Sequence, residues 1–323
     1  MALEMNRKER VLSVLKGLPV DRQPVGFWMH FPESCFFGEA SVKAHLDFFE
    51  QSRTDMCKVM TEWLYPCDHN IKAAGDWNLL PAYGEDADFI QRQAGIIGAI
   101  ASKVKDASIL GTVHGVIASA SHTLLGVQRY DSIGRHALVF HLRTNPEAFG
   151  KAIGRIADTL CNMVRAQVKA GADGIYYAAL GGETDVFTDE EHARFVAPYD
   201  KKVIEAAYDA GAKYVVLHMC KSKVNLKRFV SYNCDVVNWG IEESGMSLNE
   251  GLDLFPGKTV LGGFNNRHGS IISGDPCEIG REVDAIVSGF KGKRLILGSD
   301  CTLPGTLTYA NIAAVVEALE KRA

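Results

Sequence analysis

One histidine and two cysteines of this 323-residue chain have a spacing that is well suited to binding a metal. His218 and Cys220 are separated by one residue at the end of the apolar run YVVLH. In an extended segment, residues i and i+2 point to the same side, so both side chains can bind one ion. Cys301 follows another apolar run, LIL at 295–297, and is the candidate third ligand. An imidazole and two thiolates form a ligand set typical of Zn2+.

Three protein ligands leave one position of a tetrahedral zinc open, which is typical of catalytic zinc sites. Glu183, in the loop after the run GIYYA at 174–178, is the candidate for that position, and water or a substrate is the alternative. Asp300 is a candidate to orient His218, because ligating imidazoles usually donate their second N–H to a carboxylate or carbonyl. Its alternative role is to cap the last loop. The cysteines without such partners are expected to be structural: Cys35, Cys57, Cys67, Cys161, Cys234 and Cys277.

Further polar residues follow other apolar runs and are candidates for substrate binding. For each of them, an ordinary structural role in the core or at the surface is the alternative. They are His30, Glu62, His114, Asn238 and Asn265.

Short β-branched or aromatic runs alternate along the chain with longer segments of helical spacing. The predicted strands are 24–30, 55–60, 108–113, 174–178, 214–218, 235–238, 259–262 and 295–297. Asn145-Pro146 predicts a helix start, and the sequence from Thr188 to Glu191 predicts a capping box for a helix that runs to Ala210. Residues 61–95 are predicted to be an irregular insertion after the second strand, forming a lid or an active-site loop.

This alternation favours a parallel sheet, and eight strand–helix units indicate an α/β protein with a (β/α)8 TIM barrel. We expect one domain over residues 1–323. An open, doubly wound sheet is the alternative, but the chain contains neither a G-x-G-x-x-G fingerprint nor a P-loop. Active sites of barrels lie at the carboxyl ends of the strands, where the residues named above are predicted to lie.

The composition is 47% hydrophobic and 23% charged, with a formal net charge of -4, which is ordinary for a folded protein. A mildly acidic chain gives no electrostatic reason to expect nucleic acid as a partner. The charged N-terminal segment 1–17 is not typical of a signal peptide, and no apolar stretch is long enough to span a membrane. We therefore expect a cytoplasmic protein with reduced cysteines.

The segments around the candidate ligands resemble the uroporphyrinogen decarboxylase superfamily. The resemblance lies in LHMC (217–220), VVNWGI (236–241), GKTVLGGFNN (257–266) and LILGSDCTLPGTLTYANIAAVVEAL (295–319). It continues in AGADGIYY (170–177), FVAPYDKKVIEA (195–206) and the N-terminal segment 6–28. The resemblance implies a (β/α)8 barrel, in agreement with the alternation of elements.

One branch of that superfamily consists of decarboxylases that act on a tetrapyrrole without metal. Their N-terminal stretch resembling R-Q-A-G-R binds the carboxylates of the substrate. The corresponding segment here, GFWMHFPES at 26–34, has no arginine. A substrate with many carboxylates needs several cations, so this departure counts against decarboxylation, which stays the alternative function.

The other branch consists of zinc-dependent, cobalamin-linked enzymes similar to methylcobalamin:coenzyme M methyltransferases. Their signature of His-x-Cys after one strand and Cys after the last strand matches His218, Cys220 and Cys301. The resemblance implies methyl transfer between methylcobalamin on a partner corrinoid protein and a small donor or acceptor such as a thiol. A sulfonate on that thiol would need a cation, for which Lys221 and Arg267 are candidates.

Lys221 departs from the signature, because many members have glycine after the cysteine. Members of the family are often dimers, so the resemblance is compatible with a homodimer. An alternative from another class is a non-catalytic binding or assembly protein in which the cysteines only pack. Unreactive cysteines with no cavity beside them would favour that alternative.

Overall fold

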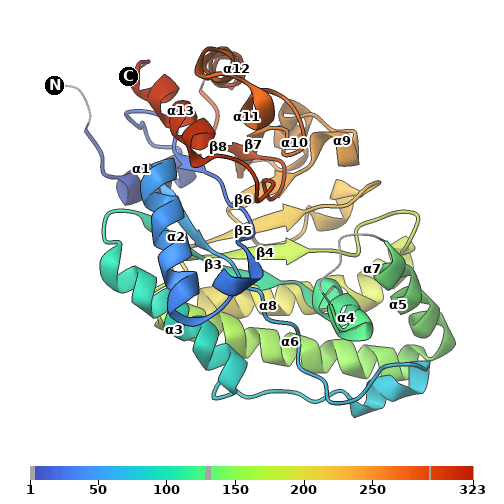
Figure 1. Cartoon of the computed structure of the whole chain (residues 1–323). Coiled ribbons are helices and arrows are strands. Elements are labelled where there is room, and N and C mark those ends of the chain that lie inside the picture. The colour runs from blue at the N-terminus through green and yellow to red at the C-terminus, as the bar shows by residue number, and fades with distance from the viewer. Residues whose placement is uncertain (1–3, 128–131, 291, 323) are drawn as a thin grey trace.

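Eight parallel strands form the centre of the protein, and helices surround them (Figure 1). The computed structural model describes residues 4–127, 132–290 and 292–322. The strands are β1 (Val25–Gly26), β2 (Met56–Val59), β3 (Ser108–His114), β4 (Gly174–Ala179), β5 (Tyr214–Met219), β6 (Val236–Trp239), β7 (Thr259–Phe264) and β8 (Leu295–Ser299). The hydrogen-bonded order runs from β2 through β8 and then to β1, as the predicted (β/α)8 barrel requires.

The barrel closes between β1 and β2 through Asp55, which immediately precedes β2. The Asp55 N–H donates to the carbonyl of Val25 at 2.8 Å, and its carboxylate accepts the Val25 N–H at 2.7 Å. Arg10 and Arg22 bind the same buried carboxylate at 2.5 and 2.7 Å. The N-terminal helix and the segment before β1 are therefore attached to the seam of the barrel.

Thirteen α-helices and three short 3-10 helices lie in the described part of the chain. The helices that cover the barrel or its ends are α1 (Arg7–Leu15), α2 (Gly38–Ser52), α3 (Asp88–Lys103), α4 (Val116–Leu125), α5 (Ile133–Thr144), α6 (Pro146–Lys169), α7 (Asp189–Phe195), α8 (Ala197–Asp209), α9 (Ile241–Ser244), α10 (Leu248–Leu254), α11 (Ser270–Ser273), α12 (Pro276–Gly289) and α13 (Tyr309–Glu320). The 3-10 helices are η1 (Glu33–Cys35), η2 (Ala74–Leu79) and η3 (Leu226–Phe229). None of the helices described has the length and apolarity needed to cross a bilayer.

Both predicted helix starts are present. The Asn145 side chain accepts the N–H of Ala148 at 3.1 Å ahead of α6, and Thr188 and Glu191 form a reciprocal capping box at α7. The single helix predicted from Thr188 to Ala210 is wrong, because the chain breaks at Val196 between α7 and α8. Pro198 explains the break: proline lacks an N–H, and its ring clashes with the carbonyl four residues earlier in a continuous helix.

The prediction that residues 61–95 are irregular holds only in part. Within this segment η2 forms, and α3 already begins at Asp88. The buried residues Phe89, Ile90, Ile96, Ile97 and Ile100 recur at helical spacing and form the packed face of α3. The strand predicted over 24–30 is also shorter than expected, with an additional bridge between Met29 and Leu303.

The interior of the barrel is filled by side chains from alternate positions of the strands. This cluster includes Trp28, Met56, Met60, Leu110, Tyr176, Tyr214, Val216, Val236, Leu261 and Ile296. The same alternation carries His218, two residues beyond Val216, into the barrel above this cluster. The packed lower interior therefore supports the open carboxyl ends of the strands, next to which α4, α5 and α7 lie in Figure 1.

Candidate metal centre and adjoining cavity

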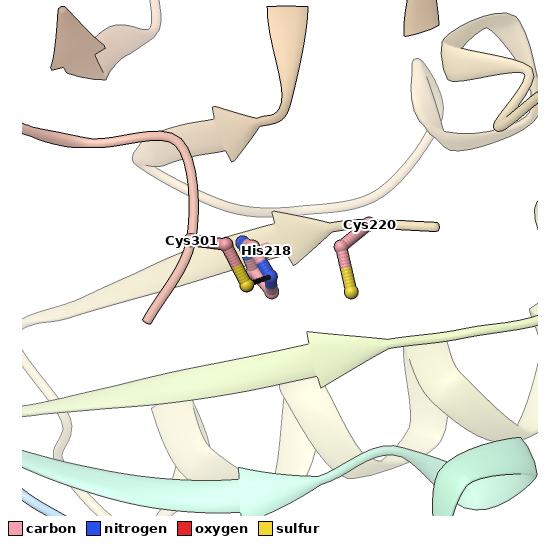
Figure 2. Close-up of side chains that lie close together, drawn as sticks. All are labelled: His218, Cys220 and Cys301. Carbon is pink, nitrogen blue, oxygen red and sulfur yellow. Dashed lines mark hydrogen bonds between the residues drawn. The ribbon is translucent and has the colours of Figure 1, made fainter. Parts of the chain in front are cut away.

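The structure brings together the three residues that the sequence analysis selects as metal ligands. His218 belongs to β5, Cys220 directly follows β5, and Cys301 lies in the loop after β8 (Figure 2). Their ligand atoms all lie within 4.8 Å of one another, and Cys301 Sγ is 3.4 Å from His218 Nε2. Ordinary bond lengths in a tetrahedral zinc site place such a nitrogen and sulfur about 3.6 Å apart. The donor set and its spacing thus fit Zn2+.

Asn238 on β6 determines how the His218 ring is presented. The Asn238 amide nitrogen donates to the carbonyls of Leu261 at 2.9 Å and Ser299 at 3.1 Å. Because carbonyls only accept, the amide oxygen must face His218 Nδ1, which lies 2.5 Å away. Nδ1 therefore carries the proton, and the lone pair of Nε2 points toward the two cysteines. This is the tautomer that a metal-binding imidazole requires.

The two cysteine thiols differ in acidity, because each acts on the pKa of the other. The Cys220 thiol lowers the pKa of Cys301 well below its ordinary value, and the positive charge of Lys221 acts in the same direction. The Cys301 side chain, together with burial, raises the pKa of Cys220. One sulfur thus has thiolate character, which favours a cation at this position.

Lys221 follows Cys220 in a backbone conformation that is unusual for its residue type. Its φ is 90°, in the region that glycine occupies without strain. Its N–H donates to Glu243 Oε2 at 3.0 Å, which holds the turn after β5. The turn therefore explains why glycine is suited to this position, and it still forms with lysine.

A cavity of about 80 Å3 adjoins the three ligand residues. It lies inside the mouth of the barrel, and most of its surface is apolar. Its lining comprises His30, Lys58, Met60, Thr112, His114, Ala118, His122, Tyr176, Ala178, Leu180, His218, Cys220, Lys221, Cys301 and Thr302. The two cysteines border a cavity, so the condition that would favour a non-catalytic protein, cysteines with no cavity beside them, is not met.

Three of the residues predicted to bind substrate are found at or beside this cavity. His30 lines it, and its Nδ1 lies 2.7 Å from the carboxylate of Glu62, which belongs to the segment after β2. His114, at the end of β3, also lines the cavity and contacts the ring of His122 edge to face. Burial lowers the pKa of His114 well below the ordinary value and that of His122 to about 4, so both are neutral at pH 7.

Glu183 is not brought to the candidate metal centre. Its buried carboxylate forms an ion pair with Arg135 and accepts the Gly181 N–H at 2.9 Å. It faces a second, polar cavity of about 420 Å3. These contacts satisfy the carboxylate in place, so it does not supply a ligand atom to the cluster.

Asp300 and Asn265 also have surroundings that differ from the predicted ones. One oxygen of Asp300 accepts the Ile241 N–H at 3.3 Å, and the position expected for it beside His218 is taken by Asn238. Asn265 accepts the N–H groups of Arg267 and His268 at 2.8 and 3.2 Å and thereby caps a turn after β7. Asn238 is fully buried and hydrogen-bonded, so it contacts the ligand His218 and not the cavity.

Lys58 is the residue at the cavity that sequence reasoning missed. It lies on β2 and is the one charged side chain within the run MCKVM (56–60). The sequence feature that could have revealed it is its position in the two-residue alternation of the strand. Every second residue of this run points into the barrel, namely Met56, Lys58 and Met60. A charge with that phase in a barrel strand has to be buried.

Comparisons with known proteins place these observations in a family context. Residues 70–322 match the uroporphyrinogen decarboxylase (URO-D) family. A search of curated protein sequences gives no match.

Solved structures with the same fold belong to proteins of several different activities. A methyltransferase from Methanosarcina mazei superposes with a TM-score of 0.77 at 19% identity, over 99% of each chain. A B12-independent methionine synthase from Shewanella sp. W3-18-1, in complex with selenomethionine, gives a TM-score of 0.61 at 12% identity, over 93% of this chain and 98% of that one. A β-mannanase from the blue mussel Mytilus edulis gives 0.56 at 14% identity, over 94% and 92%. At these identities, the similarity establishes the fold alone.

Proposed function

This chain belongs to the uroporphyrinogen decarboxylase family, and we propose that it is a zinc-dependent methyltransferase within it. It would move a methyl group between a corrinoid on a separate protein and a small molecule such as a thiol. The observation that carries the proposal is the convergence of His218, Cys220 and Cys301 beside a cavity. The similar fold of the methyltransferase from Methanosarcina mazei agrees with it.

The chain's own residues supply a site with one position left for a substrate atom. His218, Cys220 and Cys301 would hold the ion, and Asn238 keeps the His218 lone pair directed at it. A bound Zn2+ would supply positive charge that deprotonates a coordinated thiol, which makes the sulfur a nucleophile at neutral pH. Apolar lining around the cavity excludes water and keeps such a sulfur poorly solvated.

The cavity volume supports a small substrate. One water needs roughly 10–15 Å3 of such volume, so about 80 Å3 holds roughly five to eight non-hydrogen atoms. A tetrapyrrole is several times larger and would have to extend far outside this cavity. This size, together with the lack of arginine in 26–34, argues against the decarboxylase alternative. A corrinoid would likewise have to approach from outside, carried by a partner that docks on the barrel mouth.

The proposal is tested by metal analysis and a transfer assay on the same preparations. We expect about one zinc per chain by mass spectrometry of the purified protein, as a mononuclear site requires. Methyl transfer from methylcobalamin to added thiols is followed by the change in the visible spectrum. Cys220→Ser and Cys301→Ala each remove one of three ligands, so both variants should lose zinc and transfer together.

Cys277→Ser is the matched control, because Cys277 is an exposed cysteine away from the cluster. It should keep both zinc and activity. A wild-type protein without stoichiometric zinc, together with unchanged transfer in Cys220→Ser, would refute the proposal. Release of CO2 from a porphyrinogen by the metal-free protein would instead support the decarboxylase alternative.

A further inference from the structure

Lys58 is a buried lysine that borders the cavity beside the candidate metal centre. Its Nζ lies 4.2 Å from the ring centre of Tyr176 and 5.1 Å from that of Trp28. Among the described residues, its hydrogen-bond acceptor is the Met60 sulfur at 3.0 Å. A thioether is a weak acceptor, and the two rings offer only their π faces. These contacts leave an ammonium group without strong acceptors in an apolar wall.

No carboxylate of the described residues comes within 4.0 Å of Lys58 Nζ, although burying an unpaired charge is costly. Two acidic groups, Glu62 and Cys301, act on its pKa in the opposite direction to burial, and Glu62 is engaged by His30 at 2.7 Å. The metal centre does not balance the charge either, because two thiolates would be neutralised by one Zn2+. Burial accordingly lowers the pKa of Lys58 to about 7.

Thr112 supplies a second unsatisfied polar atom at the same cavity. Its hydroxyl is buried and has no hydrogen-bond partner in the described part of the chain. Thr112 lies on β3, two residues beyond Leu110, which pairs with Lys58 in the sheet register. A cation and a hydroxyl donor therefore lie on neighbouring strands, next to a space large enough for a small molecule.

We propose that Lys58 is the specificity-determining residue that receives a negatively charged group of the substrate, with Thr112 as an additional donor. An anion would return to the buried ammonium the charge partner and the strong acceptor that the protein does not supply. The same charge disfavours cationic substrates such as methylamines. The inference rests on the proposed function in taking this cavity as the substrate site.

The test compares thiols of equal size that differ in charge. The zinc-loaded protein is titrated calorimetrically with 3-mercaptopropionate and with its neutral amide, 3-mercaptopropanamide. We expect the carboxylate to bind roughly 10- to 100-fold more tightly, as a hydrogen bond to a charged group implies. A parallel pair, 2-mercaptoethanesulfonate and 2-mercaptoethanol, shows whether the site prefers a sulfonate to a carboxylate.

Lys58→Met removes the charge while keeping an unbranched chain of similar length. This variant should lose the preference for the anion, keep its affinity for the neutral thiol and keep its zinc. Lys151→Met, at an exposed pair with Glu147 on α6, is the control and should retain the preference shown by the wild type. Lys221→Met tests the other lysine that borders the cavity, from the turn after β5, and the preference should survive this change as well.

Three results would overturn the inference. They are equal binding of charged and neutral thiols by the wild type, a preference that survives in Lys58→Met, and no binding of any of the thiols. Loss of the preference in Lys221→Met alone would indicate that Lys221, in the turn after β5, binds the anion, and this result would also overturn the inference. Zinc content and methyl transfer are measured separately, so their failure would refute the proposed function and not the charge preference.

Discussion

Asn238 determines which nitrogen of His218 faces the two cysteine sulfurs. It does so because its own amide is fixed by the carbonyls of Leu261 on β7 and Ser299 on β8. Backbone carbonyls thereby fix which end of the buried Asn238 amide is oxygen and which is nitrogen. The tautomer of the His218 imidazole follows from this orientation. At the scale of single residues, the site is thus organised by a side chain that contacts a ligand and not the substrate.

Replacing Asn238 should weaken metal binding without removing a ligand. In Asn238→Ala, the His218 ring loses the acceptor of its Nδ1 proton and can rotate or change tautomer. We expect the zinc affinity to fall roughly 10- to 100-fold, as is usual for outer partners of metal ligands. Competition with a fluorescent chelator measures this change. Asn265→Ala, which alters only a turn after β7, is the control, and equal affinity of the two variants would contradict the assignment.

The convergence of the three candidate metal ligands could be predicted from the sequence because most of the information for it is local. The two-residue spacing of His218 and Cys220 on a strand fixes their common direction, and the barrel brings Cys301 toward them. The positions of Glu183 and Asp300 depend on loop conformation and on competing partners such as Arg135. Such partners are distant in sequence, so no spacing rule indicates them.

At the scale of elements, α8 is attached to the barrel by a buried carboxyl group. Asp200 on α8 accepts hydrogen bonds from the hydroxyls of Tyr177 on β4 and Tyr232 after η3, the latter at 3.1 Å. Burial raises the pKa of Asp200 to about 7. The carboxyl group is therefore protonated in the folded protein under conditions in which it ionises in the unfolded chain.

This difference makes the stability contribution of Asp200 depend on pH. Below about pH 4 both states are protonated, and the full contribution is present; it is lost as the pH rises toward 7. Asp200→Asn cannot ionise, so its stability relative to the wild type should increase by roughly 4 kcal/mol between pH 4 and 8. Urea unfolding across this range measures the difference. Asp158→Asn, at an exposed pair with Lys202, should show little such trend, and a pH-independent difference for Asp200→Asn would contradict the assignment.

The helices and strands were predictable wherever the apolar periodicity and the helix-capping residues indicate the same element. The caps at Asn145 and Thr188 are present as predicted. The helix α3 was missed because three glycines and two prolines in 61–95 indicated a loop, while the apolar face that stabilises α3 continues to Ile100. Tertiary packing of that face outweighs the weak local preference of Gly95 and Gly98 for helix.

At the scale of the whole molecule, the alternation of strands and helices was sufficient to predict the barrel, but not how it closes. The strands β1 and β2 are not neighbours in the hydrogen-bonded order, and the seam between them depends on Asp55. This one carboxylate joins Arg10 of α1, Arg22 and the backbone of Val25. The residues of this network are distant in sequence, so local sequence patterns do not predict it.

Asp55→Ala should therefore be strongly destabilising. It leaves two buried guanidinium groups without this carboxylate and one strand N–H without its acceptor. We expect a loss of roughly 3–5 kcal/mol, as for other broken buried ion pairs, measured by urea unfolding followed by circular dichroism. Asp47→Ala, which breaks an exposed pair with Lys43, should change stability by less than about 1 kcal/mol. Similar losses in both variants would show that the seam does not depend on Asp55.

The amide of Asn238 has a further consequence for how the protein meets a changing supply of metal. Because hydrogen bonds from β6, β7 and β8 hold the histidine in place, the donor geometry is preorganised and does not rely on the ion for its assembly. The free energy of coordination then goes into affinity, and little of it is spent on folding. If the chain binds zinc as proposed, we expect it to lose activity under zinc starvation while staying folded, and to regain activity when the ion returns, without new synthesis.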